Sequence, residues 1–333
     1  MKKIFLIFVI VILSSLILEF FLRLAGYRPW TTFQKEQQSL YDHNSLLGWK
    51  HKKGKYLKPS SENIGKPNIF TYETKGNRST GPKIKKYTKK IILIGGSFTQ
   101  GEGVTDNKTY AYKIQEHYPD TKIYNFGQGG YGGIQSLLLL KEEVKEINQP
   151  NIIIYAFIEH HLQRNVARSE WLEVLLKGLN KNSKYKLSLP YGTIDKNNNL
   201  KIVPSISYLT LPLREFSSLI TLLEKVYMKQ TTRHRKKEES LVFKKIISEM
   251  DKVAKKNKSK FFFVNLSLNN KNSDEVFKKI SENTNIPYLD CRVPSFNEYK
   301  LSNDWHPNIL GHEYYKDCIV NFIEKKFKKN MTN

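Results

Sequence analysis

The sequence predicts an α/β fold built around a mostly parallel central sheet. Three observations support this class: short apolar runs, helical patterns between them, and a spacing that fits strand–helix–strand units. Continuous apolar runs are typical of parallel strands that are buried on both faces. With 333 residues, of which 39% are hydrophobic, the chain is long enough for one main domain with an insertion.

The expected strands follow one another along the chain with helical patterns between them. The first strong run ends at two glycines, and the second leads into a glycine-rich segment. Right-handed crossovers bring such strands into one sheet. The expected strands are Lys90–Ile94, Lys122–Phe126, Asn151–Phe157, Lys260–Leu266 and Ile286–Leu289. The expected helices are Asn107–His117, Ile134–Ile147, Glu239–Asn257, Ser273–Asn283 and Gly311–Lys328.

Two regions depart from this alternation of strands and helices. Residues 27–89 are rich in Lys, Gly, Pro, Ser and Tyr, and we expect an extended segment that wraps onto the domain. Residues 165–235 form an expected insertion, with a hairpin over Leu187–Val203 and an amphipathic helix over Leu213–Met228. The main domain is expected to span residues 90–329.

Residues 1–26 have the pattern of a membrane segment. Two lysines precede an apolar run from Ile4 to Leu18, and a helix continuing to Leu24 reaches the roughly 20 residues that cross a bilayer. A cleaved signal peptide, which would give a secreted protein, is the alternative. No small-residue cleavage site precedes Gly26, so we expect an uncleaved anchor. The initial lysines then place the rest of the chain in the periplasm or outside the cell.

The chain is strongly basic, with a formal net charge of +24. Such a charge attracts anionic lipid headgroups, acidic glycans or nucleic acid. Because the lysines are spread along the sequence without a recognition helix, zinc spacing or RNA-binding motif, we expect no nucleic-acid partner. The two cysteines, Cys291 and Cys318, do not define a disulfide framework, and we expect no bond between them.

Ser97 is the candidate nucleophile. It follows Gly95 and Gly96 at the carboxyl end of the first strong strand, where parallel sheets place their ligand crevices. The glycines allow a sharp turn, and the Ser97 amide can face a developing oxyanion. A serine after two glycines is most often a turn or helix-cap residue, so the assignment depends on a base elsewhere in the chain.

His306 is the candidate base, and Asp304 is its candidate partner. Both lie in the segment Asn303–His312, before the last expected helix. A carboxylate beside the imidazole can orient the ring and stabilise its charged form, while the other ring nitrogen takes the serine proton. The sequence therefore predicts a Ser97–His306–Asp304 cluster at one edge of the sheet.

Three ordered blocks resemble those of SGNH hydrolases, also called GDSL-like. They are Gly95–Gly101 (GGSFTQG), Asn125–Tyr131 (NFGQGGY) and Asp304–Gly311 (DWHPNILG). The resemblance covers about residues 90 to 325 and implies a flavodoxin-like three-layer α/β/α sandwich with ester chemistry that needs no metal or cofactor. It implies Ser97 as nucleophile and oxyanion donor, Gly130 as second donor through its amide, and Asp304 with His306 as the remaining catalytic pair.

The loop after the third expected strand departs from the family pattern. The family has an Asn there, within a Gly-x-Asn-Asp pattern, whereas this chain reads Tyr155–His161. By alignment to the strand end, His160 takes the Asn place and can donate a ring N–H when neutral. His161 takes that role if the loop shifts by one residue. If both histidines are structural, only two backbone donors are left.

Other residues of the chain are alternative candidates for the base and the acid. His312 is a rival base, although its place in the last helix favours packing, and Asp290 is a rival acid at the end of the last strand. Adjacent side chains such as His160 and His161 diverge, so we expect no metal site. The glycine-rich segment 127–133 lacks the spacing of nucleotide-binding loops, so we expect no nucleotide cofactor.

These observations predict an extracytoplasmic serine esterase or O-acyltransferase that acts through an acyl-enzyme on Ser97. An acylated surface glycan, or another small ester, is the expected substrate by analogy with membrane-anchored members of the family. Two alternatives remain. One is a weakly catalytic glycan-binding or assembly protein, suggested by the missing Asn and by an Asp-x-His spacing one residue shorter than usual. The other is a lipase.

Overall fold

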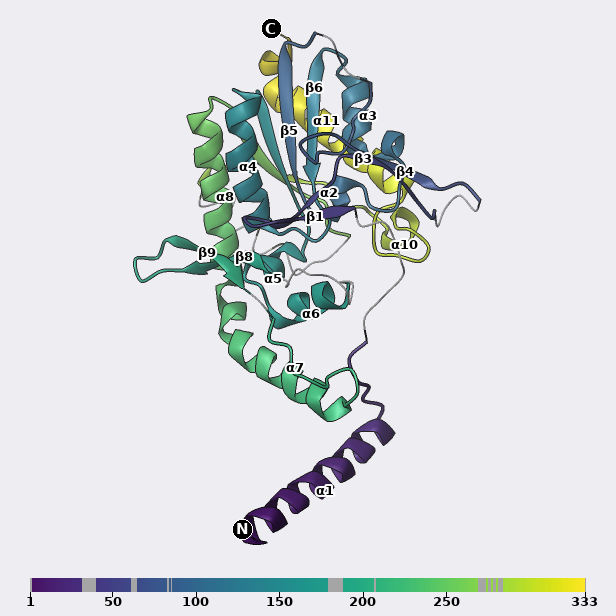
Figure 1. Ribbon diagram of the computed structural model, residues 1–333. Coiled ribbons are helices and arrows are strands. Elements are labelled where there is room, and N and C mark those ends of the chain that lie inside the picture. Colours follow the sequence, from purple (N-terminus) through teal and green to yellow (C-terminus); the bar gives the residue numbers. More distant parts are fainter. Residues whose placement is uncertain are drawn as a thin grey trace.

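A five-stranded parallel sheet lies at the centre of the main domain (Figure 1). The computed structural model describes residues 2–31, 40–60, 65–82, 84, 86–178, 188–206, 208–268, 274, 277, 280 and 284–332. The strand order is β11-β10-β7-β5-β6, which corresponds to the flavodoxin-like order. The strands are β5 (Lys89–Gly95), β6 (Thr121–Gly127), β7 (Ile152–Phe157), β10 (Lys260–Asn265) and β11 (Tyr288–Asp290). The predicted α/β class and parallel sheet are confirmed.

Helices cover both faces of this sheet because its strands carry apolar side chains on both sides. One core layer lies under α4 (Gly133–Ile147) and α8 (Glu239–Lys256), and the other under α3 (Tyr110–His117) and α11 (Ile309–Thr332). Ile92 and Ile94 face the first layer, and Ile91 and Leu93 face the second. This alternation produces the three layers. Most of the predicted helix Ser273–Asn283 lies outside the described residues.

The segment before β5 wraps onto the domain through two hairpins. They pair β1 (Tyr41–Asn44) with β2 (Gly48–His51), and β3 (Gly54–Lys58) with β4 (Asn68–Tyr72). Arg78 is fully buried and joins this segment to the domain, since its guanidinium donates to the carbonyls of Gln100 and Val104 and contacts Asp106 at 2.9 Å. The segment is thus tied to the loop that follows β5.

The insertion contains a hairpin and a long helix. The hairpin pairs β8 (Leu189–Ile194) with β9 (Leu200–Ile206), and Asp195 accepts the amides of Asn197 and Asn199 in its turn, as the polar run predicted. The other elements are α5 (His161–Asn165), α6 (Ser169–Lys177), α7 (Ser218–Thr232) and the 3-10 helix η2 (Arg233–Glu238). A short helix, α10 (Phe296–Tyr299), precedes the last predicted loop.

The helix predicted from Leu213 begins later than expected. Leu213 has a φ of +63°, which is incompatible with a right-handed helix, and Ser217 caps α7 by accepting the amide of Ile220. The apolar spacing did predict a helix here, but its start depended on a capping serine.

The two cysteines form a disulfide, so the prediction of no bond was wrong. Cys291 lies directly after β11, and Cys318 lies on α11, which packs beside that strand end with a Cα–Cα distance of 5.9 Å. This distance suits a disulfide. The contact depends on how α11 crosses the sheet, which a separation of 27 residues does not reveal.

The amino-terminal helix α1 (Lys2–Leu24) projects away from the domain (Figure 1). None of its residues is buried, and within the described chain it is the one helix long and apolar enough to cross a membrane. Length and composition agree with either a membrane anchor or a signal sequence.

Candidate active site

Ser97 lies at the carboxyl end of β5, an inner strand between β7 and β6, as the first residue of the short helix α2 (Ser97–Gln100). The turn depends on close backbone packing. A Cβ on Gly95 would lie 2.7 Å from the carbonyl oxygen of Ala156, and one on Gly127 would collide with the backbone of Thr99 and Gln100. Glycine is therefore required at both strand ends for α2 to lie against the sheet.

The structure brings Ser97, His306 and Asp304 together. The Nε2 atom of His306 lies 2.9 Å from Ser97 Oγ, and its Nδ1 lies 2.8 Å from Asp304 Oδ2. When Nδ1 carries the proton and donates to the carboxylate, Nε2 is free to accept the serine proton. Side chains up to 209 positions apart in the chain therefore form a connected hydroxyl, imidazole and carboxylate.

The loop that carries His306 is held by hydrogen bonds to the last residue of α10 and to the segment that follows this helix. Leu301 N donates to His306 O at 2.8 Å, and Asn308 N donates to Tyr299 O at 3.0 Å. Asn308 also caps α11, because its Oδ1 accepts the amide of Gly311. Since Asn308 is fixed at the start of a core helix, the imidazole two residues earlier is held at the sheet edge.

The Asp304 carboxyl is partly exposed, and its surroundings favour the charged carboxylate. Burial raises its pKa, whereas the hydrogen bond and charge of His306 and the amide of Trp305 lower it, and the net pKa lies below the ordinary value. The carboxylate side chain is 44% exposed and the imidazole 22%. Both groups are therefore accessible from solvent, and Ser97 lies deeper.

Gly130 lies in the loop between β6 and α4, at a φ of +82° that favours glycine. Two aromatic rings enclose it, since a Cβ there would lie 3.0 Å from Trp49 and 3.2 Å from Trp171. The indole nitrogen of Trp49 donates to the carbonyl of Gly129 at 3.0 Å, and Arg164 donates to the carbonyl of Tyr131 at 3.1 Å. The carbonyls on both sides of Gly130 are thus fixed.

The two histidines after β7 have different environments. His161 is fully buried: its Nδ1 lies 2.7 Å from the Tyr155 hydroxyl, and its Nε2 has no hydrogen-bond partner. That Nε2 points at the turn before the serine, because a Cβ on Gly96 would lie 2.6 Å from it. His160 is exposed at the start of α5. Of the two imidazoles, only that of His160 is open to a ligand.

Both rings are held in the neutral form. Desolvation, followed by the charge of Arg164, lowers the pKa of His160 and lowers that of His161 further, and His306 adds to the effect on His160. A neutral imidazole has one N–H donor and one acceptor nitrogen. The exposed ring of His160 can therefore donate to an oxyanion without carrying a charge itself.

The alternative candidates, His312 and Asp290, contact groups other than Ser97 and His306. His312 is buried, its Nδ1 accepts the amide of Tyr110 at 3.3 Å, and its ring stacks on that tyrosine. Asp290 accepts hydrogen bonds from Arg292, including one of 2.6 Å. The packing interpretation of His312 is confirmed, and Asp304 is the carboxylate that contacts His306.

Sequence reasoning missed the residues that support the glycine loop from outside the three blocks. Trp49 belongs to the wrapping segment, and Arg164 to the start of the insertion. The Arg164 guanidinium lies 4.3 Å from the Trp171 ring, and burial lowers its pKa to about 10. In the sequence, only the aromatic side chain of Trp49 could have indicated such a supporting role. Its hydrogen bond to Gly129, 80 residues later in the chain, depends on the fold and could not be predicted.

Comparisons with known proteins give similarity in solved structures only. No family model matches the sequence, and no curated protein matches it. A lipolytic G-D-S-L family protein from Veillonella parvula is 11% identical, with a TM-score of 0.38 over 72% of this chain and 99% of that one. An acetyl xylan esterase from Geobacillus stearothermophilus is 13% identical, with a TM-score of 0.38 over 72% and 97%.

A psychrotrophic esterase from Pseudoalteromonas sp. is 10% identical, with a TM-score of 0.39 over 71% of this chain and 100% of that one. The fold class is established by the strand order of this chain and does not rest on these similarities. A parallel sheet in the flavodoxin-like order, with helices on both faces and the serine turn after the inner strand β5, defines a flavodoxin-like α/β/α architecture.

Proposed function

We propose that this chain is a membrane-anchored, extracytoplasmic serine esterase or O-acyltransferase that works through an acyl-enzyme on Ser97. The observation that carries the proposal is the continuous connection from Ser97 Oγ to His306 Nε2, at 2.9 Å, and from His306 Nδ1 to Asp304, at 2.8 Å. This arrangement activates a hydroxyl for attack on an ester carbonyl.

In the proposed mechanism, Ser97 Oγ attacks the acyl carbon while His306 Nε2 accepts its proton. The oxyanion is stabilised by the amides of Ser97 and Gly130 and by the ring N–H of His160. The imidazolium then protonates the departing alkoxide, and the acyl group stays on Ser97. Water or a sugar hydroxyl attacks the acyl carbon next and gives its proton to His306, which passes it to Ser97 Oγ as the bond between Oγ and the acyl carbon breaks.

An acylated glycan is the proposed substrate, and the exposed Trp305 favours it. This side chain is 70% exposed although it lies between Asp304 and His306, and its ring is 5.0 Å from that of Phe296. An exposed aromatic face beside a reactive group is typical of a binding surface and can contact the apolar face of a sugar ring.

The esterase proposal is tested with the full chain in detergent. We expect p-nitrophenyl acetate turnover to fall roughly 10³-fold or more in Ser97→Ala and His306→Ala, and a fluorophosphonate probe to label the unaltered protein but not Ser97→Ala. Ser136→Ala is the matched control, because this serine is also buried but lies in α4. Equal turnover in all four proteins would exclude the mechanism.

The third oxyanion donor is tested separately. His160→Ala should lower kcat roughly 10²-fold with little change in folding, since this side chain is exposed. His161→Ala should instead lower the unfolding midpoint, because this ring fills a buried space beside Tyr155. If kcat falls only in His161→Ala at a temperature where both variants are folded, the donor is His161.

The substrate class is tested with Trp305→Ala. We expect KM for an O-acetylated oligosaccharide to rise roughly tenfold, while turnover of p-nitrophenyl acetate is unchanged. Glycan binding without turnover would indicate a non-catalytic binding protein. A preference for long acyl chains over acetyl would indicate a lipase.

A further inference from the structure

The end of α1 is joined to the start of α7 by a set of hydrogen bonds. The carboxylate of Glu19 accepts the Ser217 hydroxyl at 2.8 Å and the amides of Ser218 and Leu219 at 2.9 Å each. Arg23 of the same helix donates to the carbonyl of Phe216 at 2.6 Å. Helix amino termini carry unpaired N–H groups and favour negative charge, so Glu19 acts as an added cap for α7.

This α1–α7 junction makes the amino-terminal helix part of the folded insertion. The chain after α1 adds to it, since Trp30 N donates to the Thr221 hydroxyl and to the carbonyl of Arg214. Ser218 Oγ donates to the carbonyl of Tyr27. Cleavage near residue 26 would remove Glu19 and leave two α7 amides without this acceptor, so the junction favours a retained helix.

One face of α7 carries apolar side chains that the domain does not cover. Phe216, just before the helix, is 74% exposed, followed by Leu223 at 54%, Val226 at 48% and Tyr227 at 54%. Spacings of seven and then three or four residues place them on one side of the helix. The opposite side is buried against the domain through Thr221, Glu224 and Met228.

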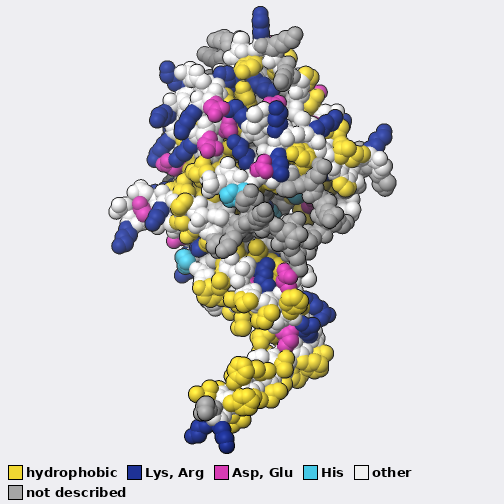
Figure 2. Space-filling model, viewed as in Figure 1, with side chains coloured by type: hydrophobic (Ala, Val, Ile, Leu, Met, Phe, Trp, Pro, Cys, Tyr) yellow, Lys and Arg dark blue, Asp and Glu magenta, His cyan; other side chains and the backbone are white. Residues whose placement is uncertain are grey.

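This apolar face is continuous with the surface of α1. Figure 2 shows hydrophobic side chains covering α1 and continuing onto the adjoining end of the domain, where α7 lies in Figure 1. The two helices run in different directions from their shared junction. A bilayer crossed by α1 would therefore have its surface beside the exposed face of α7.

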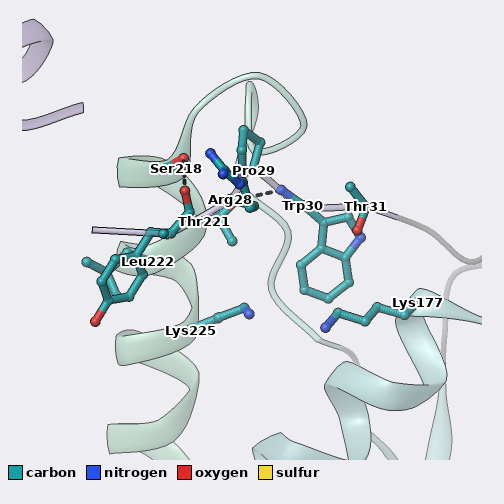
Figure 3. A pocket seen from close by; sticks show the side chains of 11 residues that line it. Arg28, Pro29, Trp30, Thr31, Lys177, Ser218, Thr221, Leu222 and Lys225 are labelled. Atoms are coloured by element: carbon teal, nitrogen blue, oxygen red, sulfur yellow. Dashed lines mark hydrogen bonds between the residues drawn. The ribbon is translucent and has the colours of Figure 1, made fainter. Parts of the chain in front are cut away.

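A pocket of about 320 Å³ opens at the same junction (Figure 3). Arg28, Trp30, Lys177 and Lys225 line it, together with Tyr27 and residues of α7. Lys177 and Lys225 both contact Glu173, at 2.8 and 2.9 Å. Near the Trp30 ring, Arg214 pairs with Glu224 at 2.9 Å. The lining of the pocket thus contains three basic side chains, Arg28, Lys177 and Lys225, and the two lysines share the carboxylate of Glu173.

We infer that α7 and this pocket form a docking surface for the phospholipid bilayer that α1 crosses. The apolar side chains enter the boundary between headgroups and acyl chains, as in interfacial amphipathic helices. The basic pocket takes the phosphate of an anionic lipid, since basic side chains at a membrane surface attract anionic headgroups. The inference concerns orientation on the membrane and does not depend on the esterase proposal.

The experiment uses the full chain in vesicles of phosphatidylcholine, alone or mixed with phosphatidylglycerol. A bimane probe is attached at Leu223→Cys or, as control, at Lys325→Cys in the last part of α11, the helix that leads to the carboxyl terminus at the end of the molecule away from α1 (Figure 1). The native cysteines are held in their disulfide. With lipids that carry a quencher in the acyl chain, we expect several-fold stronger quenching at position 223 than at position 325. Equal, weak quenching at both positions would overturn the inference.

Two further variants test the separate parts of this surface. Glu19→Ala should lower quenching at position 223 while the protein still sediments with vesicles, because α1 remains inserted but no longer fixes α7. The double variant Arg28→Ala and Lys225→Ala should abolish any gain in quenching caused by phosphatidylglycerol. A gain that persists in the double variant would exclude the pocket as the lipid-phosphate site.

Discussion

The two ends of the molecule are held together in different ways. At the sheet edge, the loops around Ser97 are fixed by backbone packing against glycines and by a buried aromatic and guanidinium frame. At the α1–α7 junction, polar side chains such as Glu19 cap a helix whose outer face is apolar and exposed. In the two proposals above, the fixed loops at one end hold the reacting groups, and the apolar face at the other end contacts the lipid bilayer.

The first prediction removes the charge on Asp304. Asp304→Asn keeps the shape of the side chain but presents an amide to His306, which favours the wrong tautomer of the ring. We expect kcat/KM for p-nitrophenyl acetate to fall roughly 10³-fold, or about 4 kcal/mol of transition-state stabilisation. As a control from the other end of the molecule, Leu223→Ser should keep full turnover. A loss of similar size in Leu223→Ser would show that the two ends are not independent.

The second prediction compares two glycines, one from each end. Gly127→Ala forces a Cβ against the backbone of α2, and we expect a loss of about 3 kcal/mol in the free energy of unfolding. Gly178→Ala places its Cβ no nearer than 3.5 Å to other atoms at the end of α6, at a φ of −81°, and should be neutral or slightly stabilising. Urea unfolding of the full chain in detergent measures both, and equal stability of the two variants would contradict the packing argument.

The site residues that sequence reasoning found are those fixed by topology. Ser97 follows a strand buried on both faces, and His306 precedes a core helix, so both must reach the carboxyl edge of a parallel sheet. Their meeting was therefore predictable, although their catalytic roles stay predictions. The choice between His160 and His161 was not, because a shift of one residue at a helix start exchanges a buried ring for an exposed one.

Contacts between distant segments could not be predicted from spacing. Trp49 supports the carbonyl of Gly129 from a segment that appeared only extended, and the Cys291–Cys318 pairing depends on the path of α11. In the insertion, periodicity indicated the α7 helix but not that Glu19 would cap it from about 200 residues away. Polar caps and cross-links leave no periodic pattern, whereas buried strands do.

The third prediction concerns the disulfide. Reduction of Cys291–Cys318 opens a loop of 27 residues, and we expect the free energy of unfolding to fall by about 3 kcal/mol. Because the disulfide lies in the sheet domain, its removal should leave the quenching of a probe at Leu223→Cys in vesicles unchanged. Thermal unfolding with and without reductant measures the effect in the natural sequence. Cys291→Ala with Cys318→Ala should be insensitive to reductant, and a midpoint that still shifts would show another cause.

The fourth prediction is the smallest and concerns acid. Burial, with the charges of Arg78, His306 and Lys113, lowers the pKa of His312 to about 3. An unfolded histidine takes up a proton below about pH 6.5, whereas the folded ring resists it, so the stability present above pH 6.5 is lost as pH falls toward 3. The contribution of His312 alone should lower the free energy of unfolding by about 2 kcal/mol between pH 7 and pH 5.

His312→Gln tests this prediction, because the glutamine side chain can still accept the Tyr110 amide but does not titrate. The variant should be less stable at pH 7, yet its further loss between pH 7 and pH 5 should be smaller than in the natural chain. Part of the acid sensitivity should persist, since burial also lowers the pKa of His51 and His161 well below the ordinary value. If the variant and the natural chain lose the same stability between pH 7 and pH 5, the His312 ring takes up its proton in the folded protein and the prediction is wrong. Since none of these three buried histidines belongs to α1 or α7, acid should weaken the end of the molecule that holds Ser97 before it frees the α1–α7 junction.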